Sequence, residues 1–234
     1  MTIRGLLFDK DGTLLDYGAT WMPVNRAAAR AAAGGEAALE ARLLRAGGYD
    51  AARDRVRANS PLAVGNTVEI AESWIGHLPE WRRDDLVALL DRVFQAEGRL
   101  STVPVPGLAS VLGRLKARGL MLGVATSDSE KGIEATLSPL GVVEMFDFRA
   151  GYDSGHGVKP GPGMVRAFCV ASGLDPAAIA VVGDSLHDLA MGRAAGAGLV
   201  VGVLTGTGTR GELAAYADHV LDSIAELEAL LDRV

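Results

Sequence analysis

Two aspartates near the start of the chain, Asp9 and Asp11, directly follow an apolar run in the string FDKDGTL (8–14). Residues two apart at the end of a strand point their side chains the same way, and Gly12 allows a tight turn that brings main-chain N–H groups toward whatever the carboxylates face. Carboxylates this close favour a bound cation or a shared proton. The pair suits phosphoryl transfer, in which one aspartate attacks phosphorus and the other handles a proton. The alternative is a turn that caps a helix at Thr13.

A second acidic pair lies in the string GDSLHD (183–188), where Asp184 ends an apolar run and Asp188 follows four residues later. Four residues make about one helical turn, so both carboxylates could approach one cation from the same side. Hard oxygen ligands suit Mg²⁺, which binds through one or two carboxylates together with substrate phosphate. The alternative is an aspartate helix cap with a solvated partner.

Two further positions could hold a phosphoryl group. Lys159 lies in the string GVKP (157–160), where a compact cation beside glycines can offset phosphate charge, although a lone lysine is more often a solvated surface charge. Thr126 ends another apolar run and is followed by Ser127. Their hydroxyls and N–H groups could bind phosphate oxygens, and helix capping is an equally simple interpretation.

The elements that must position these residues follow an alternating pattern. Apolar runs at 3–8, 120–125, 178–183 and 198–203 alternate with segments of helical period at 108–118, 130–140, 163–172 and 186–195. This alternation predicts an α/β fold with a doubly wound parallel sheet covered by helices on both faces. Ligands of such sheets bind outside the carboxyl ends of the strands, which is where Asp9, Thr126 and Asp184 occur.

One long segment breaks the alternation, because residues 16 to about 102 contain helical stretches and no convincing strand. A gap of this length cannot be a bare loop in a compact domain. The sequence therefore predicts a helical cap domain over residues 16–101, inserted into a core domain formed by residues 1–15 and 102–234.

Composition excludes several classes of protein. The 234 residues carry a net charge of −6 with no dense basic tract, which disfavours binding to nucleic acid or to an anionic membrane. The single cysteine excludes an internal disulfide framework. The start of the chain does not read as a signal peptide, and no run approaches the roughly 18 apolar residues of a membrane span. We therefore expect a cytoplasmic globular protein, with its oligomeric state left open.

The four motifs, in this order, resemble the haloacid dehalogenase-like hydrolase superfamily over nearly the whole chain. The resemblance implies a Rossmann-like core with a C1 helical cap, and an enzyme that forms an aspartyl-phosphate with Mg²⁺ as cofactor. It implies Asp9 as nucleophile and Asp11 as general acid and base. The same resemblance assigns phosphate contacts to Gly12, Thr126, Ser127 and Lys159, and metal ligation to Asp9, Asp11 (through its main-chain carbonyl), Asp184 and Asp188, the last directly or through water.

Within the superfamily, the strings GYD (151–153) and GVLTGTGTRGEL (202–213) are most similar to phosphoglycolate phosphatases. The expected function is hydrolysis of a small phosphomonoester metabolite, with 2-phosphoglycolate as a candidate substrate. The first alternative is a β-phosphoglucomutase-like phosphomutase, which uses the same core but protects the aspartyl-phosphate from water. The second is a phosphate-ester-binding module without turnover, which the retained Asp9, Asp11 and Lys159 disfavour.

Some positions depart from the family pattern or are left open by it. Lys10 replaces a commoner apolar residue, and Asp128 stands near where many relatives carry asparagine. No motif defines roles for these two residues or for His187. In the cap, Trp21 could line the entrance to the site, and Arg57 and Asn66 could reach a substrate carboxylate.

Overall fold

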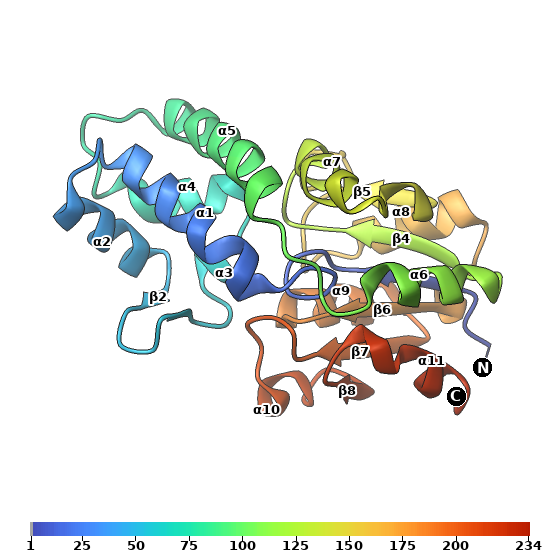
Figure 1. Cartoon of the computed structure of the whole chain (residues 1–234). Coiled ribbons are helices and arrows are strands. Elements are labelled where there is room, and N and C mark those ends of the chain that lie inside the picture. Colours follow the sequence, from blue (N-terminus) through green and yellow to red (C-terminus); the bar gives the residue numbers. More distant parts are fainter. Residues whose placement is uncertain (1) are drawn as a thin grey trace.

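A six-stranded parallel sheet forms the centre of the computed structural model, which describes residues 2–234. The strand order β5-β4-β1-β6-β7-β8 places the first strand in the middle of the sheet (Figure 1). The strands are β1 (Gly5–Phe8), β4 (Met121–Ala125), β5 (Phe148–Ala150), β6 (Ile179–Gly183), β7 (Leu199–Val203) and β8 (His219–Leu221). The predicted α/β fold with a parallel sheet and a helical insertion after the first strand is confirmed.

Helices cover both faces of the sheet because successive residues of a strand point to opposite faces. Leu6 and Phe8 pack into a core cluster with α6 and α7, while Leu7 packs into a second cluster with α8 and α9. Strands buried on both faces need continuous apolar runs, and β1, β6 and β7 are fully buried. The helices are α6 (Leu108–Ala117), α7 (Glu130–Leu137), α8 (Gly163–Ser172), α9 (Leu186–Ala195), α10 (Arg210–Leu213) and α11 (Leu227–Leu231).

The insertion after β1 is helical and has its own hydrophobic core around the fully buried Trp74. Figure 1 shows it as a separate lobe beside the carboxyl ends of the strands, with the chain termini at the far side of the core. It comprises α1 (Tyr17–Ala32), α2 (Ala37–Ala46), α3 (Pro61–Val64), α4 (Thr67–Ile75) and α5 (Arg83–Ser101), with a short hairpin of β2 (Tyr49–Asp50) and β3 (Arg55–Val56). The domain limits at 15/16 and 101/102 stay a prediction.

The two connections between the lobes run side by side. The Asp16 N–H donates to the Val103 carbonyl (2.9 Å), and the Val105 N–H donates to the Leu14 carbonyl (3.0 Å). Asp16 also caps α1 by accepting from the Ala19 N–H (2.8 Å). The paired linkers thus fix where the cap leaves and re-enters the core.

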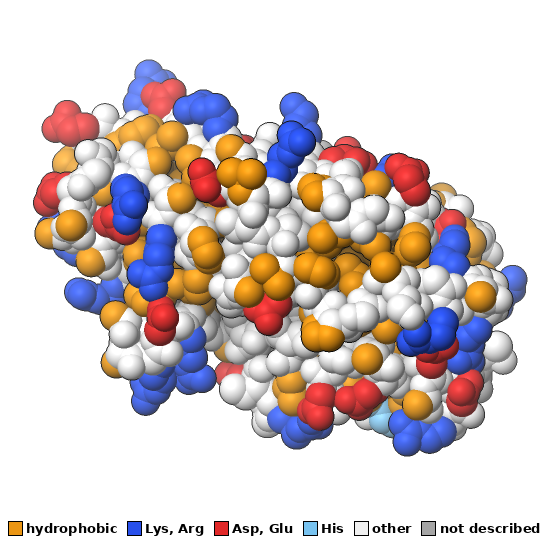
Figure 2. All heavy atoms as spheres, viewed as in Figure 1, with side chains coloured by type: hydrophobic (Ala, Val, Ile, Leu, Met, Phe, Trp, Pro, Cys, Tyr) orange, Lys and Arg blue, Asp and Glu red, His pale blue; other side chains and the backbone are white. Residues whose placement is uncertain are grey.

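Acidic and basic side chains are interspersed over the face shown in Figure 2, with hydrophobic side chains gathered near its middle. Within residues 2–234, the structure contains no helix that combines the length and the apolar character needed to cross a membrane. The cytoplasmic location stays a prediction.

The packing of α8 on the sheet yields a testable expectation. A Cβ at Gly123 of β4 would lie 2.8 Å from Leu7 Cδ1 and 3.1 Å from the Phe168 ring. We expect Gly123→Val to lower the free energy of unfolding by about 1–3 kcal/mol through overpacking. Urea denaturation measures this change, with Gly113→Val at an open helix position as the control for the valine itself. Equal losses in the two variants would contradict the packing argument.

Candidate functional site

The carboxyl ends of three adjacent strands bring the predicted residues together. Asp9 follows β1, Thr126 follows β4 and Asp184 follows β6, and β1 pairs with both of the other strands. Their side chains line a pocket with a volume of about 60 Å³ between core and cap. The core contributes Asp9, Asp11, Thr126, Ser127, Asp128, Lys159, Asp184, Ser185 and Asp188 to its lining.

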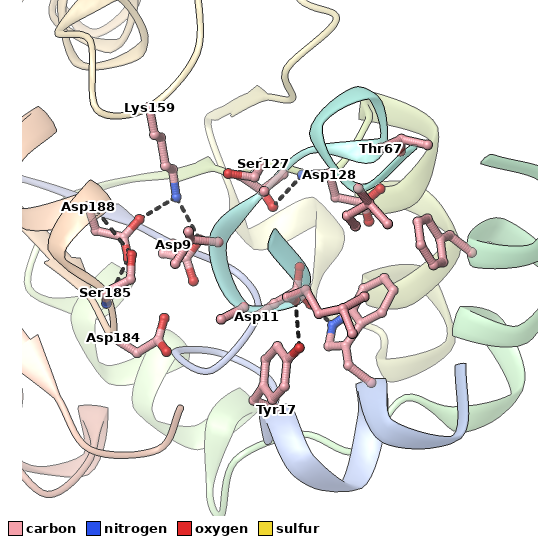
Figure 3. Close-up of a pocket in the computed structure, with 18 of the residues that line it drawn as sticks. Asp9, Asp11, Tyr17, Thr67, Ser127, Asp128, Lys159, Asp184, Ser185 and Asp188 are labelled. Carbon is pink, nitrogen blue, oxygen red and sulfur yellow. Dashed lines mark hydrogen bonds and ion pairs between the residues drawn. The ribbon is translucent and has the colours of Figure 1, made fainter. Parts of the chain in front are cut away.

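Lys159 is held between two carboxylates at the floor of this pocket (Figure 3). Its Nζ lies 2.6 Å from Asp9 Oδ1 and 2.5 Å from Asp188 Oδ1, and all three residues are buried. The second oxygen of Asp188 accepts hydrogen bonds from the Ser185 N–H (3.0 Å) and hydroxyl (2.6 Å). Both oxygens of Asp188 are therefore engaged, which fixes its orientation.

The arrangement of carboxylates fits a divalent cation. Asp9, Asp184 and Asp188 each offer an oxygen, and these oxygens lie within 4.8 Å of one another. Asp9 Oδ2 is buried and has no hydrogen-bond partner among the described residues. An unpaired buried carboxylate oxygen is costly unless a cation or proton satisfies it. All-oxygen donors of this kind suit Mg²⁺.

The pKa values of Asp9 and Asp184 are both raised, which also indicates that the cluster lacks positive charge. Burial raises the pKa of Asp9 to about 7; Lys159 opposes this shift, and the charges of Asp188 and Asp11 add to it. Burial likewise raises the pKa of Asp184 well above its usual value, with Asp9 and Asp188 contributing. Without added positive charge, these carboxyl groups hold protons at pH values where exposed aspartates are ionised.

Asp11 lies in a separate set of contacts. Both of its oxygens are 2.9 Å from Lys10 Nζ, and its Oδ1 accepts a hydrogen bond from Trp21 Nε1 of the cap helix α1. Its carboxyl group therefore does not join the cluster of Asp9, Asp184 and Asp188, and the predicted metal contact through its main-chain carbonyl stays a prediction.

The two departures from the family pattern form one buried ion pair. Lys10 Nζ lies 2.9 Å from Asp128 Oδ2 and 5.1 Å from the centre of the Trp21 ring. Burial opposes the Lys10 charge, but Asp11 and Asp128 outweigh it and raise the pKa of Lys10 above its usual value. The lysine would be an unpaired buried charge without Asp128 and Asp11, so these two carboxylates stabilise its burial.

Gly12 differs from its expected role. It is not among the residues that line the pocket, and its N–H donates to the Leu15 carbonyl (2.8 Å), so this N–H is not free for phosphate. Gly12 instead has a φ of 93°, and a Cβ there would lie 2.7 Å from Asp184 Cγ. Glycine is needed for the turn and for the close approach of this loop to Asp184.

A loop after β7 supports the site and was not predicted as part of it. The Thr207 N–H donates to Asp184 Oδ2 (2.7 Å), and the Thr205 hydroxyl donates to the Gly12 carbonyl (2.6 Å). The string TGTG (205–208), rich in small hydroxyl residues and glycine after a buried strand, is the signal that could have identified this support.

The remaining predicted residues divide into two groups. Thr126 and Ser127 line the pocket, and so does Trp21 as expected. His187, Arg57 and Asn66 do not line it. Asn66 caps α4 by accepting from the Glu69 N–H (3.0 Å), and Arg57 is exposed, so neither offers the expected contact to a substrate carboxylate in this pocket.

Comparison with known proteins agrees with this geometry. The model of the haloacid dehalogenase-like hydrolase family matches residues 3–196. This chain belongs to the haloacid dehalogenase-like hydrolase family. Among relatives of this hydrolase, the N-acetylmuramic acid 6-phosphate phosphatase of Pseudomonas aeruginosa is 29% identical over 84% of this chain and 80% of its own length. The phosphoglycolate phosphatase of Escherichia coli is 28% identical over 83% of this chain and 79% of its own.

Solved structures of the family share the fold of this hydrolase. A predicted phosphoglycolate phosphatase from Haemophilus somnus superposes with a TM-score of 0.74, at 22% identity, over 98% of either chain. The order of strands and the helical insertion after β1 are therefore those of the family.

The raised pKa of Asp9 generates a prediction on stability in the absence of metal. Because the folded protein binds this proton more tightly than the unfolded chain, the contribution of Asp9 to stability falls as the pH rises from about 4 to about 7. We expect Asp9→Asn to be more stable than the wild type at pH 8 in EDTA, by on the order of 1–3 kcal/mol, and not at pH 4. Urea denaturation at both pH values measures the difference.

Added Mg²⁺ serves as the control, because it should stabilise the wild type at pH 8 more than the Asp9→Asn protein. The difference in free energy of unfolding between the wild type and Asp9→Asn should change between pH 4 and pH 8. An equal difference at both pH values would contradict the claim that burial destabilises the ionised Asp9.

The pair of Lys10 and Asp128 predicts coupling between two substitutions. Lys10→Met leaves two carboxylates facing each other without a cation, and we expect it to cost about 3 kcal/mol of stability. Asp128→Asn added to Lys10→Met should recover part of this loss, because it removes one of the two unpaired charges. Strictly additive free energies of unfolding in the double-mutant cycle would rule out the interaction.

Proposed function

We propose that this hydrolase is a Mg²⁺-dependent phosphatase that hydrolyses a small phosphomonoester through an aspartyl-phosphate on Asp9. Its membership of the family and the names of its phosphatase relatives support the general activity. The observation that carries the proposal is the unpaired, buried Oδ2 of Asp9, which lies at the floor of a pocket beside Lys159 and two further carboxylates. The carboxylate of Asp9 therefore keeps an oxygen that no neighbouring side chain occupies, as a nucleophile or a metal ligand requires.

In the first step, a carboxylate oxygen of Asp9 attacks phosphorus and the bond from phosphorus to the ester oxygen breaks. Asp11 donates a proton to the departing oxygen, so that the alcohol leaves neutral. Burial keeps the pKa of Asp11 above its usual value, although the Lys10 charge and the Trp21 hydrogen bond lower it. Asp11 is thus suited to carrying a proton in this pocket.

In the second step, a water molecule attacks the phosphorus of the aspartyl-phosphate and Asp11 takes the proton of that water. Inorganic phosphate leaves, and both aspartates return to their starting states. Lys159 and the hydroxyls of Thr126 and Ser127 bind the phosphoryl oxygens through both steps in this proposal, which their position in the pocket lining supports. Mg²⁺ held by Asp9 and Asp184, with Asp188 in support, would supply the positive charge that balances phosphate and carboxylates.

The cap wall completes the pocket and excludes water from the reacting atoms. Trp21 of α1 reaches across to the carboxyl group of Asp11, so the cap contributes directly to the position of the proposed acid. The substrates named for the relatives, phosphoglycolate and N-acetylmuramic acid 6-phosphate, are both phosphomonoesters, which supports this class of substrate for the chain.

Phosphate release from a panel of phosphorylated metabolites, with Mg²⁺ and with EDTA, tests the proposal. We expect Asp9→Asn to lower kcat by at least about 10³-fold, because the nucleophile is lost, and Asp11→Asn to lower it by about 10²–10⁴-fold. Asp222→Asn, at an exposed carboxylate far from the pocket lining, is the matched control. Turnover of the Asp9→Asn protein at the wild-type rate would refute the nucleophile, and sugar-phosphate isomerisation faster than phosphate release would identify a phosphomutase.

A further inference from the structure

We propose that the cap selects esters whose alcohol part is small and uncharged, and that it discriminates against alcohols that carry a carboxylate. This inference rests on the proposed function, since it concerns the leaving group of the same reaction. The inference predicts that this chain disfavours the substrates named for its relatives, because both glycolate and muramic acid carry a carboxylate.

The pocket lacks a cation for a second anionic group. Among the described residues that line it, Lys159 alone is cationic, and its ammonium is already shared by Asp9 and Asp188. Five aspartates line the same space, namely Asp9, Asp11, Asp128, Asp184 and Asp188. A divalent ion and Lys159 would both face the phosphoryl group and the acidic cluster, which leaves no positive charge for a carboxylate on the alcohol.

Lys10 does not change this balance. Its side chain is fully buried, and its Nζ is engaged by Asp11 on one side and Asp128 on the other. It does not line the pocket. A substrate carboxylate near this point would meet Asp128 and Asp11 before it met the lysine.

The wall that the alcohol would touch comes from the cap and carries no charged side chain. Its residues are Tyr17, Trp21, Asn25, Leu62, Ala63, Val64, Gly65, Thr67, Ile70 and Phe94, from α1, α3, α4 and α5 and the adjoining loop. The polar groups of Tyr17 and Asn25 are partly satisfied within the wall, because the tyrosine hydroxyl donates to the Leu62 carbonyl (2.6 Å) and accepts from Asn25 Nδ2 (3.3 Å).

The cap cations nearest in sequence to this wall are committed elsewhere or exposed. Arg26 of α1 donates to Tyr49 Oη (2.7 Å) and pairs with Asp54 (2.8 Å). Arg92 of α5 and Arg57 are exposed and outside the pocket lining. A carboxylate moved from water into this wall would therefore lose its hydration without gaining a partner.

The size of the pocket sets the second part of the proposal. The pocket has a volume of about 60 Å³, a few times the roughly 10–15 Å³ that one water needs, so a bound phosphoryl group leaves limited room for the alcohol. The rings of Trp21 and Phe94, both in the wall, pack edge to face with their centres 5.7 Å apart. These side chains suit a short uncharged alcohol.

Two esters of nearly equal shape test the inference, namely 2-phosphoglycolate and its neutral amide, carbamoylmethyl phosphate. We expect kcat/KM with Mg²⁺ to be at least about tenfold higher for the amide, because only the carboxylate lacks a counter-charge. Equal values, or a preference for 2-phosphoglycolate, would overturn the inference while leaving the proposed phosphatase activity intact.

A cation placed in the wall provides the matched variant. Val64 lines the pocket and is only half-buried, so Val64→Lys can be accommodated, and Val64→Gln supplies a neutral side chain of similar length. We expect Val64→Lys to shift the ratio of the two kcat/KM values toward 2-phosphoglycolate by at least about threefold, and Val64→Gln to leave the ratio unchanged. An unshifted ratio in a folded Val64→Lys protein would count against the inference.

The two failures can be told apart. If the wild type hydrolyses neither these esters nor any other in the panel, the proposed function fails. The esters then remain intact in solution, and calorimetric titration of the wild type with each of them in Mg²⁺ still measures the preference. Tighter binding of the amide would support the inference, and equal or tighter binding of 2-phosphoglycolate would overturn it.

Discussion

Several buried carboxylates share one small space at the carboxyl ends of β1 and β6, and the rest of the site depends on how their charge is balanced. Asp9, Asp184 and Asp188 are each less than a tenth exposed. Their mutual repulsion and loss of hydration are opposed by Lys159 inside the cluster. The imbalance that remains makes the space suited to a divalent cation and a phosphoryl group.

The negative charge of Asp11, beside this cluster, is balanced by a different cation, Lys10. Lys10 and Asp128 form a buried pair there, and Trp21 from the cap adds a hydrogen bond to Asp11. The proposed acid is thus held by one residue of its own loop and one of the cap. The position of the proposed acid therefore depends on the packing of the cap against the core.

The fold serves this chemistry by separating the reacting groups from the surface that contacts the alcohol. The reacting groups belong to rigid strand ends in the core, and the wall belongs to helices with their own hydrophobic cluster. The hydrogen bond between the linkers at Asp16 and Val103 fixes where the cap is attached to the core. Because the wall has its own core, its side chains can differ among relatives without disturbing the strand ends, and so can the alcohol that it admits.

The sequence by itself determined the fold class, the place of the inserted helices and most of the core side of the site. Apolar runs that end at Asp9, Thr126 and Asp184 specify parallel strands, and the topology of such a sheet forces their carboxyl ends together. Lys159 was assigned to the same place from its glycine-rich string before a helix and from the order of motifs that resembles the family.

Only the tertiary structure decided which groups are paired and which are free. The occupied N–H of Gly12, the support of Asp184 by Thr207, and the pairing of Lys10 with Asp128 all depend on contacts between distant segments. The uncharged cap wall is decided in the same way, since residues from four helices reach it while Arg57 and Asn66 of the same lobe do not. Local spacing carries no information on such contacts, because they arise from how preformed elements pack against one another.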